Sequence, residues 1–255
     1  MPFFLLLFFI LCQNCASAGE IPSLCKIRHP SDSTIKWECR RIKSGGTLES
    51  IFGDRWIDVA RFNRVDRRHT YPGINIKVPK DLDDIKEFNP LPLEYPQAED
   101  DEKFILVDLS EQFLGAYEYG RLVFSFPVAT GEKGHSTPTG EFSINAFSRN
   151  HLSYKYVIEN TDIPYPMNFA MRFWTAKNGN SFWIHGRDLP GYAASHGCLG
   201  LYDEEMQEKY YGYPKDPVLD SARRLYEWVI GSRRDDGEFT TLKDGPRVLI
   251  VGKAP

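Results

Sequence analysis

The chain has 255 residues, of which 42% are hydrophobic and 26% charged, and its formal net charge at pH 7 is −4. This length allows one or two folded domains with ordinary hydrophobic cores. The slight acidic excess disfavours a nucleic-acid-binding surface, which needs clustered basic residues. One run of arginines is interrupted by Asp58 and Asp66, and we interpret it as a solvated helix face (Arg61, Arg64, Arg67 and Arg68).

The N-terminal residues predict an export signal. An uncharged apolar run from Phe3 to Cys12 is followed by Ala16-Ser17-Ala18, a small-x-small pattern that a signal peptidase could cut. The run is shorter than the roughly 20 residues that a membrane-spanning helix needs, so we expect no permanent membrane span. We therefore predict a signal peptide over residues 1–18, a mature chain from Gly19, and export of that chain.

The mature chain would carry three cysteines, namely Cys25, Cys39 and Cys198. An oxidising compartment favours a disulfide between Cys25 and Cys39, which are separated by a short loop. Cys198 is then the odd thiol. An unpaired cysteine in an exported protein points to a reactive role for that residue.

Residues 35–79 predict a small unit of alternating structure. A glycine pair at Gly45 and Gly46 turns the chain into Thr47, which is a good N-cap for a helix. Later, a turn at Pro72-Gly73 precedes alternating apolar residues that indicate a strand. The predicted order is strand, helix, helix, strand, over Ile35–Ile42, a helix that begins at Leu48, Trp56–Asn63 and Ile74–Pro79.

Several residues of this unit form a recognisable pattern, namely Gly46-Thr47-Leu48, Ile51, Val59-Ala60, Asn63, Pro72-Gly73 and Ile76-Lys77-Val78-Pro79. They resemble the LysM family of carbohydrate-binding domains. The resemblance implies binding of glycan that contains N-acetylglucosamine, through the loops at the two ends of the first helix. The pattern departs from the family at Gly46, where an acidic residue is usual. The alternative is a small spacer domain that binds nothing.

A proline-rich acidic stretch separates this unit from the rest of the chain. Pro90, Pro92 and Pro96 lie among acidic residues with few periodic apolar positions, which indicates an interdomain connector rather than a packed element. We therefore predict a LysM-like domain at residues 19–80, a linker at 81–102 and a larger domain at 103–255.

The larger domain reads as mainly β. Short apolar runs separated by Gly, Asn and Pro predict a sandwich or barrel with few helices. The predicted strands include Phe104–Leu109, Ala116–Tyr119, Leu122–Ala129, a strand after Thr137–Phe142, one that delivers His185 to its end, and Arg247–Val251. Helical spacing predicts one long helix over Pro217–Ile230. Residues 208–241 include Tyr210, Tyr211 and Tyr213, and form either a lid or a packed flank.

Two histidines and the odd thiol lie together in a glycine-rich segment at His185, His196 and Cys198. A purely structural role fits poorly with side chains in glycine-rich turns. A zinc site is also disfavoured, because a closed site needs a fourth ligand at recognisable spacing. Nucleophilic catalysis fits best, since an imidazole can take the thiol proton or hold it in a thiolate–imidazolium pair.

Motifs along the larger domain then identify a family. They are Val107–Gln112, Phe126–Gly131, Thr137–Phe142, Ile163–Met167, His185-Gly186 and Ser195–Leu199, followed by an acidic helix start at Asp203. In this order they resemble the YkuD-type L,D-transpeptidases. Pairing with a LysM-like unit behind a signal peptide fits, because both parts would act on peptidoglycan stem peptides and glycan strands.

The resemblance implies a role for each matching residue. Cys198 would be acylated by the third residue of a stem tetrapeptide with release of D-alanine, and an amine acceptor would then form a crosslink. His185 would be the base, oriented by the carbonyl of Gly186. Backbone amides around His196, Gly197 and Cys198 would form the oxyanion hole, and a carbapenem should acylate the thiol. No metal or cofactor is implied. Candidate substrate-binding residues are Tyr165, Met167, Arg187, Ser195 and Gly200.

One position departs from the family. An arginine usually follows the cysteine by two residues, and this chain has Gly200 there. Arg187 or Arg172 could supply the charge instead. The loss also leaves open a hydrolytic L,D-carboxypeptidase or amidase, in which water resolves the acyl-enzyme. An inactive wall-binding module is the non-enzymatic alternative.

Overall fold

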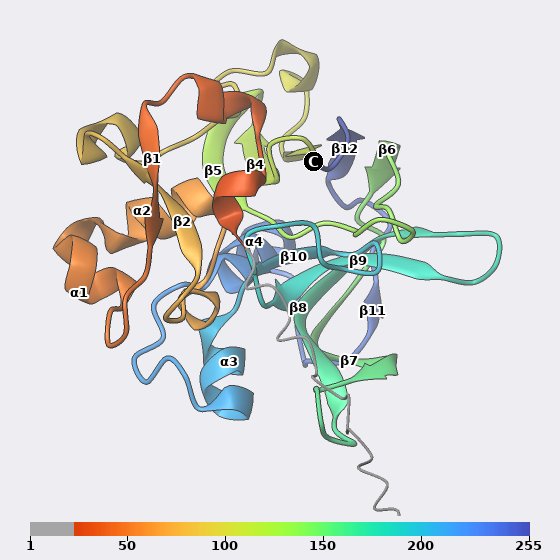
Figure 1. Ribbon diagram of the computed structural model, residues 1–255. Coiled ribbons are helices and arrows are strands. Elements are labelled where there is room, and N and C mark those ends of the chain that lie inside the picture. Colours follow the sequence, from red (N-terminus) through yellow and green to blue (C-terminus); the bar gives the residue numbers. More distant parts are fainter. Residues whose placement is uncertain (1–22) are drawn as a thin grey trace, which may run out of the picture.

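The computed structural model describes residues 23–255 (Figure 1). The predicted signal peptide at residues 1–18 lies outside this part of the chain. Within residues 23–255, no helix combines the length and the apolar character that crossing a membrane requires.

The N-terminal unit pairs two strands around two short helices, in the order expected from the sequence. The elements are β1 (Trp37–Arg41), α1 (Leu48–Phe52), α2 (Trp56–Asn63) and β2 (Asn75–Pro79), with β1 and β2 antiparallel. The Thr47 hydroxyl accepts the Ser50 amide N–H at 3.2 Å, and the Thr47 amide donates to the Ser50 hydroxyl at 2.9 Å. This capping box explains why α1 begins at Leu48. A disulfide joins Cys25 to Cys39.

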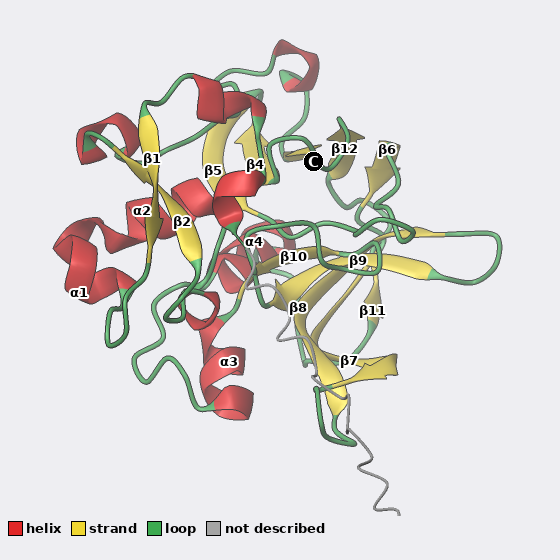
Figure 2. Ribbon diagram, viewed as in Figure 1, coloured by secondary structure: helices red, strands yellow, loops and turns green. Residues whose placement is uncertain are grey.

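The larger part of the molecule consists of two five-stranded sheets (Figure 2), in agreement with the predicted mainly β class. All neighbouring strands pair antiparallel except β3 with β12 and β9 with β10. One sheet has the order β5 (Arg121–Pro127), β4 (Phe113–Glu118), β3 (Phe104–Asp108), β12 (Arg247–Val251) and β6 (Gly140–Ser143). The other has the order β10 (Leu199–Tyr202), β9 (Ser181–Arg187), β8 (Pro164–Thr175), β7 (Ala146–Val157) and β11 (Thr240–Thr241).

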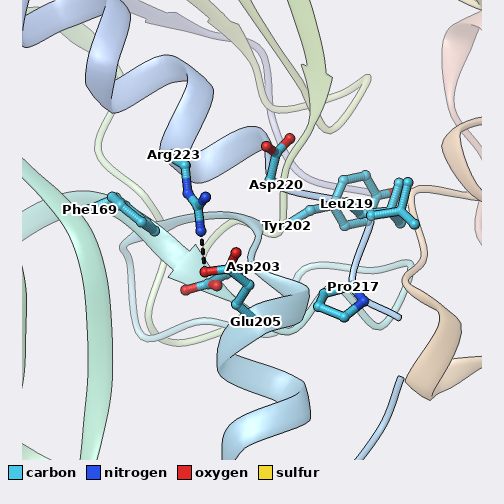
Figure 3. Close-up of a pocket in the computed structure, with 9 residues that line it drawn as sticks. Phe169, Tyr202, Asp203, Glu205, Pro217, Leu219, Asp220 and Arg223 are labelled. Atoms are coloured by element: carbon cyan, nitrogen blue, oxygen red, sulfur yellow. Dashed lines mark ion pairs between the residues drawn. The ribbon is translucent and has the colours of Figure 1, made fainter. Parts of the chain in front are cut away.

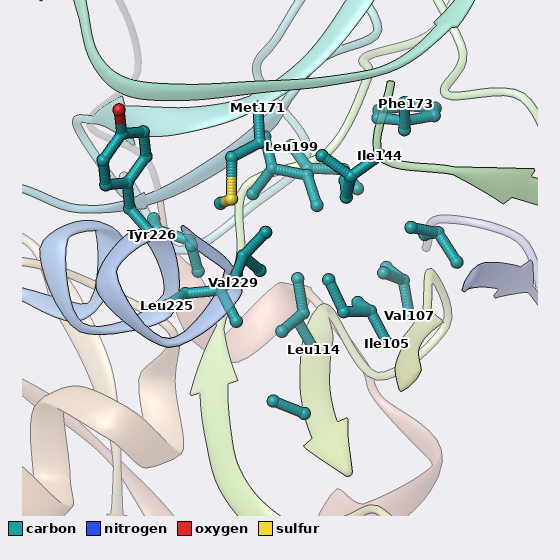
Figure 4. Close-up of a cluster of buried hydrophobic side chains, with 14 of the residues drawn as sticks. Ile105, Val107, Leu114, Ile144, Met171, Phe173, Leu199, Leu225, Tyr226 and Val229 are labelled. Carbon is teal, nitrogen blue, oxygen red and sulfur yellow. The ribbon is translucent and has the colours of Figure 1, made fainter. Parts of the chain in front are cut away.

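The main core lies between these sheets and is closed by α4 (Ser221–Ile230), as Figure 4 shows. Leu225, Tyr226 and Val229 of this helix meet apolar side chains of both sheets. The helix begins four residues after the predicted Pro217. Its expected first turn is extended instead, because the amides of Val218 and Leu219 donate to the buried carboxylate of Glu204.

Within residues 208–241 the helix α4 forms a packed flank, whereas Gly212, Tyr213, Lys215 and Asp216 are exposed. The segment contains the end of α3 (Glu204–Tyr211) and all of α4. Ala222, Leu225 and Val229 are at most 1% exposed and belong to the main core.

Residues 81–102 are packed, which corrects the expectation of an unpacked connector. They contain two 3-10 turns, Leu82–Ile85 and Pro96–Ala98. Ile85, Phe88 and Leu91 are buried in a second core that includes residues of both the N-terminal unit and the β3–β4 hairpin. The prolines shape the path of this segment, while its scattered apolar side chains hold it against both parts.

The expectation of a solvated arginine face is wrong for Arg64 and Arg67. These side chains are only 1% and 4% exposed. Arg64 pairs with Glu111 at 3.1 Å, and Arg67 meets both carboxylate oxygens of Glu204 at 2.8 and 2.6 Å. Both carboxylates come from the larger part of the chain, so their proximity could not be recognised from local charge pattern.

A further set of contacts joins the N-terminal unit to the segment after β9. The Asp66 amide donates to the carbonyl of Leu189 at 2.8 Å, and the Leu189 amide donates to the Asp66 carboxylate at 2.7 Å. Arg68 pairs with Asp188 at 2.7 Å. The N-terminal unit is thus docked against the segment that directly follows the strand carrying His185.

Candidate active site

Two neighbouring strands carry the predicted nucleophile and base. His185 lies within β9 and Cys198 directly precedes β10. The strands pair in parallel with Gly200 opposite His185, so continuing this register places Cys198 opposite Trp183. Side chains two residues apart in a strand share a face of the sheet. Cys198 and His185 therefore lie on one face as diagonal neighbours.

The ring of His185 is held by its own strand. Its Nδ1 lies 2.8 Å from the carbonyl oxygen of Gly186. A carbonyl oxygen only accepts hydrogen bonds, so Nδ1 carries the proton and Nε2 keeps a free lone pair. This is the tautomer that a general base requires.

Gly186 has no side chain, which allows Asp203 to lie close to the backbone next to His185. A Cβ atom at this position would overlap the carboxylate of Asp203, which caps α3 by accepting the Met206 amide at 3.1 Å. Asp203 also accepts a hydrogen bond from Asn168 at 2.9 Å. Figure 3 shows Asp203 in a small hollow beside α3, where Arg223 forms an ion pair with Glu205. Asp203 thus lies against the backbone of the strand that carries His185.

Burial favours the uncharged forms of both reactive groups. It lowers the pKa of His185 to about 3, and the positive charge of Arg187 acts in the same direction. Burial raises the pKa of Cys198, against a backbone hydrogen bond with Trp183 and the field of Arg187. At neutral pH the resting pair is therefore a thiol and a neutral imidazole rather than a thiolate–imidazolium pair.

The turn before Cys198 is organised by Ser195. The Ser195 hydroxyl accepts the Gly197 amide N–H at 3.0 Å and donates to the carbonyl of Cys198 at 2.6 Å. Gly197 has a φ of +110°, which favours glycine. Because its amide is engaged by Ser195, Gly197 does not offer the oxyanion-hole donor that was expected of it. The amides of His196 and Cys198 donate to no described residue.

Cys198 and His185 both line one cavity of about 830 Å³. Most of the predicted site residues line it, namely Tyr165, Met167, His185, Arg187, Ser195, His196 and Cys198. Gly186, Gly197 and Gly200 contribute backbone behind this lining. Arg172, the second candidate for a substitute charge, also lines the cavity.

A model of the YkuD family, described as the L,D-transpeptidase catalytic domain, matches residues 102–230. The matched residues make up half of the chain. The chain belongs to the YkuD family of L,D-transpeptidases. The family match begins at the start of the two-sheet part and includes β9, Cys198 and β10.

Individual relatives carry the same family name. A protein of Bacillus licheniformis that bears the name L,D-transpeptidase YkuD is 28% identical over 174 residues, which cover 66% of this chain and 88% of the relative. An L,D-transpeptidase from Xylanimonas cellulosilytica is similar at 18% identity and a TM-score of 0.44, over 85% of this chain and 98% of that one. LdtMt1 in complex with imipenem is similar at 18% identity and a TM-score of 0.39, over 58% of each chain.

In the YkuD domain of this chain, the Arg187 side chain occupies the space next to Gly200. A Cβ atom at position 200 would overlap the Cγ and Cδ atoms of Arg187, whose side chain lies across the glycine. The Arg187 guanidinium donates to the carbonyls of Asp188 at 3.1 Å and Ala194 at 3.3 Å. Among residues 23–255, no carboxylate forms an ion pair with Arg187.

One wall of the cavity of this YkuD domain was not predicted from the sequence. It is formed by the long hairpin of β7 and β8, whose His151, Tyr154 and Tyr156 line the same cavity as Cys198. His151 stacks on Trp183 with ring centroids 4.4 Å apart. The alternation of Leu152, Tyr154 and Tyr156 with polar residues was the available signal for a strand.

Proposed function

We propose that this protein is an exported peptidoglycan L,D-transpeptidase in which Cys198 is the nucleophile and His185 its base. The observation that carries the proposal is the register of β9 and β10, which sets both side chains on one face at the same cavity. The tether from His185 Nδ1 to Gly186 supports it, because it leaves Nε2 facing away from the backbone as a proton acceptor.

The proposed reaction has two steps. Nε2 of His185 takes the thiol proton as Cys198 Sγ bonds to the carbonyl carbon of the third stem residue. The amide bond to D-alanine breaks, and His185 returns the proton to its amine. The amine of an acceptor stem then attacks the thioester, loses a proton to His185, and the thiol re-forms with a crosslink between the stems. The amides of His196 and Cys198 are the proposed oxyanion donors.

Arg187 is the proposed anchor for a carboxylate of the donor stem. Its guanidinium lies in the cavity and forms no ion pair with a described carboxylate, so an anionic substrate group would complete its coordination. Because Gly200 leaves the space that the Arg187 side chain fills, the pair can supply the charge that the family usually places at position 200. Tyr165 and Met167 would border the same donor.

Replacing Arg187 with alanine is expected to lower kcat/KM for a tetrapeptide donor by about tenfold to a hundredfold, the worth of one charge-assisted contact. The control substrate is the same donor with its terminal carboxylate replaced by a neutral amide. Wild type should discriminate against it, and R187A should not. Equal discrimination in both proteins would show that Arg187 does not bind that carboxylate.

Product analysis distinguishes transpeptidation from the alternatives. Purified protein is incubated with a defined disaccharide-tetrapeptide, and the masses of the products are measured by mass spectrometry. A crosslinked dimer supports transpeptidation. A tripeptide alone indicates the hydrolytic L,D-carboxypeptidase, which water access to the thioester would permit. Binding without any product indicates an inactive wall-binding module.

The N-terminal unit is proposed to be a LysM-like domain, residues 19–80, that binds glycan strands. Its strand–helix–helix–strand order and the capped start of α1 support this proposal. The unit would hold the YkuD domain against the wall, with residues 81–102 between them.

Asp54 is exposed in the 3-10 turn that follows α1, and Asp84 is exposed outside the proposed surface. D54W should weaken binding to purified sacculi severalfold while D84W does not. Equal binding would contradict the proposed surface.

A carbapenem should acylate Cys198 for the same chemical reason as the donor, since its strained amide carbonyl would enter beside the thiol. LdtMt1, with which this chain shares 18% identity, is found in complex with imipenem. The periplasm or cell wall is the proposed location, in keeping with a wall-acting family and with the Cys25–Cys39 disulfide.

A further inference from the structure

Three side chains that could bind a metal lie together at the edge of the cavity, and none of the three side chains has a part in the proposed acyl transfer. Glu132 and His135 belong to the loop between β5 and β6, and His196 belongs to the turn before Cys198. The ligand atoms of the three side chains all lie within 4.8 Å of one another. Glu132 Oε1 is 3.6 Å from His135 Nδ1 and 3.9 Å from His196 Nε2.

The backbone fixes the two loops against each other. The Glu132 amide donates to the carbonyl of Ser195, and the His135 amide donates to the carbonyl of Glu132, each at 2.9 Å. Gly131 permits this turn, because a Cβ atom there would overlap the carbonyl of His135. The three ligands are therefore brought together by a preformed scaffold rather than by chance contact of long side chains.

The imidazoles are also held by their neighbours. His196 stacks on Tyr156 with centroids 4.3 Å apart and meets the edge of His135 at 4.7 Å. Within residues 23–255, the ion-pair partners of the Glu132 carboxylate are these two histidines.

Two imidazole nitrogens and one carboxylate oxygen are a ligand set that zinc accepts. Zinc bonds of about 2.1 Å in tetrahedral geometry place ligand atoms about 3.4 Å apart. The ligand atoms of the two histidines lie 3.6 and 3.9 Å from Glu132 Oε1, and all three lie within 4.8 Å of one another, so rotation of these half-exposed side chains would bring them to that spacing. We propose that Glu132, His135 and His196 bind a divalent metal ion of the zinc type, with a fourth position open to solvent.

Such an ion would control access rather than take part in acyl transfer. It would tie the 132–135 loop to the turn that carries Cys198 and hold His196 and Tyr156 at the cavity wall. A stem peptide would then enter a narrower opening that carries added positive charge. Zinc is expected to lower turnover reversibly, and a chelator should restore it.

Calorimetric titration of zinc chloride into the chelator-treated full chain tests the site. All titrations use a C198A background, so that the thiol cannot serve as a ligand. The parent should bind one zinc ion per chain, and magnesium should not bind because it prefers all-oxygen sites. Adding H135A or E132Q should weaken zinc binding at least about a hundredfold, since each removes one direct ligand. H151A is the matched control, because His151 lines the same cavity outside the cluster.

Unchanged zinc binding in both H135A and E132Q would overturn the proposal, as would absence of saturable binding in the C198A parent. Thermal unfolding of each variant shows whether it is folded. If H135A does not fold, the isosteric E132Q variant still tests the site. The binding result does not depend on the proposed transpeptidase activity. Loss of zinc inhibition in H135A, measured as the ratio of turnover with and without zinc, does depend on it.

Discussion

Replacing Cys198 with alanine is expected to lower release of D-alanine from a stem tetrapeptide by more than about a thousandfold, because the acyl-enzyme cannot form. No other thiol can substitute within residues 23–255, where Cys25 and Cys39 are joined in a disulfide and Cys198 is free. Urea unfolding of C198A should match wild type, which separates lost chemistry from lost folding. Turnover by C198A would contradict the assignment of the nucleophile.

His185→Ala should lower turnover by about a hundredfold to ten-thousandfold, the usual contribution of a general base. It should also change the pH dependence. Since the pKa of His185 is lowered to about 3, the base is already neutral at pH 5, and wild-type kcat/KM should be nearly flat from about pH 5 to 8. Without the base, attack needs an ionised thiol.

Turnover by H185A should therefore rise about tenfold per pH unit toward the raised pKa of Cys198. Alkylation of wild-type Cys198 by iodoacetamide checks the resting state independently. A neutral thiol reacts faster as pH rises, whereas a thiolate–imidazolium pair would react at a constant rate across this range. A constant rate would contradict the neutral pair.

Replacing Arg67 with methionine is expected to lower the free energy of unfolding by about 3–5 kcal/mol, the usual cost of leaving one partner of a buried ion pair without the other. Glu204 is fully buried, and it would lose both of its contacts with the Arg67 guanidinium. The substitution should destabilise the N-terminal unit and the YkuD domain together, because Arg67 joins them. Urea unfolding followed by tryptophan fluorescence measures this.

The matched control is R234M, which breaks the exposed pair between Arg234 and Asp236. An exposed pair contributes about 0–1 kcal/mol, so this variant should unfold almost as wild type does. Because Arg67 pairs with the buried Glu204, we expect removal of residues 19–80 to lower the stability of the YkuD domain as well as to weaken wall binding. Two separate unfolding transitions, with R67M affecting only one of them, would contradict a shared interface.

Local pattern was sufficient where each element carries its own signals. The capped helix at Thr47, the helix Trp56–Asn63 and the strand Arg247–Val251 all have the bounds that their residues suggest. The glycines and histidines around Cys198 likewise predicted which residues would share a cavity. These features depend on neighbours in the sequence.

Local pattern failed where the decisive partner is distant. Arg64 and Arg67 looked solvated because Glu111 and Glu204, which pair with them, lie far along the chain. For Gly200 the sequence left Arg187 and Arg172 open as substitutes for the missing charge, and only the parallel register shows that the Arg187 side chain fills the space above Gly200. The acidic linker was misread because its few apolar side chains enter a core made by other segments.

The most direct test of the central claim is the intact mass of the protein after brief mixing with a stem tetrapeptide and no acceptor. We expect an adduct equal to the donor minus D-alanine, located on the peptide that contains Cys198 and released by hydroxylamine as expected of a thioester. Adding an acceptor amine should discharge it into crosslinked product. An adduct on another residue, or turnover with no bond to Cys198, would contradict the account.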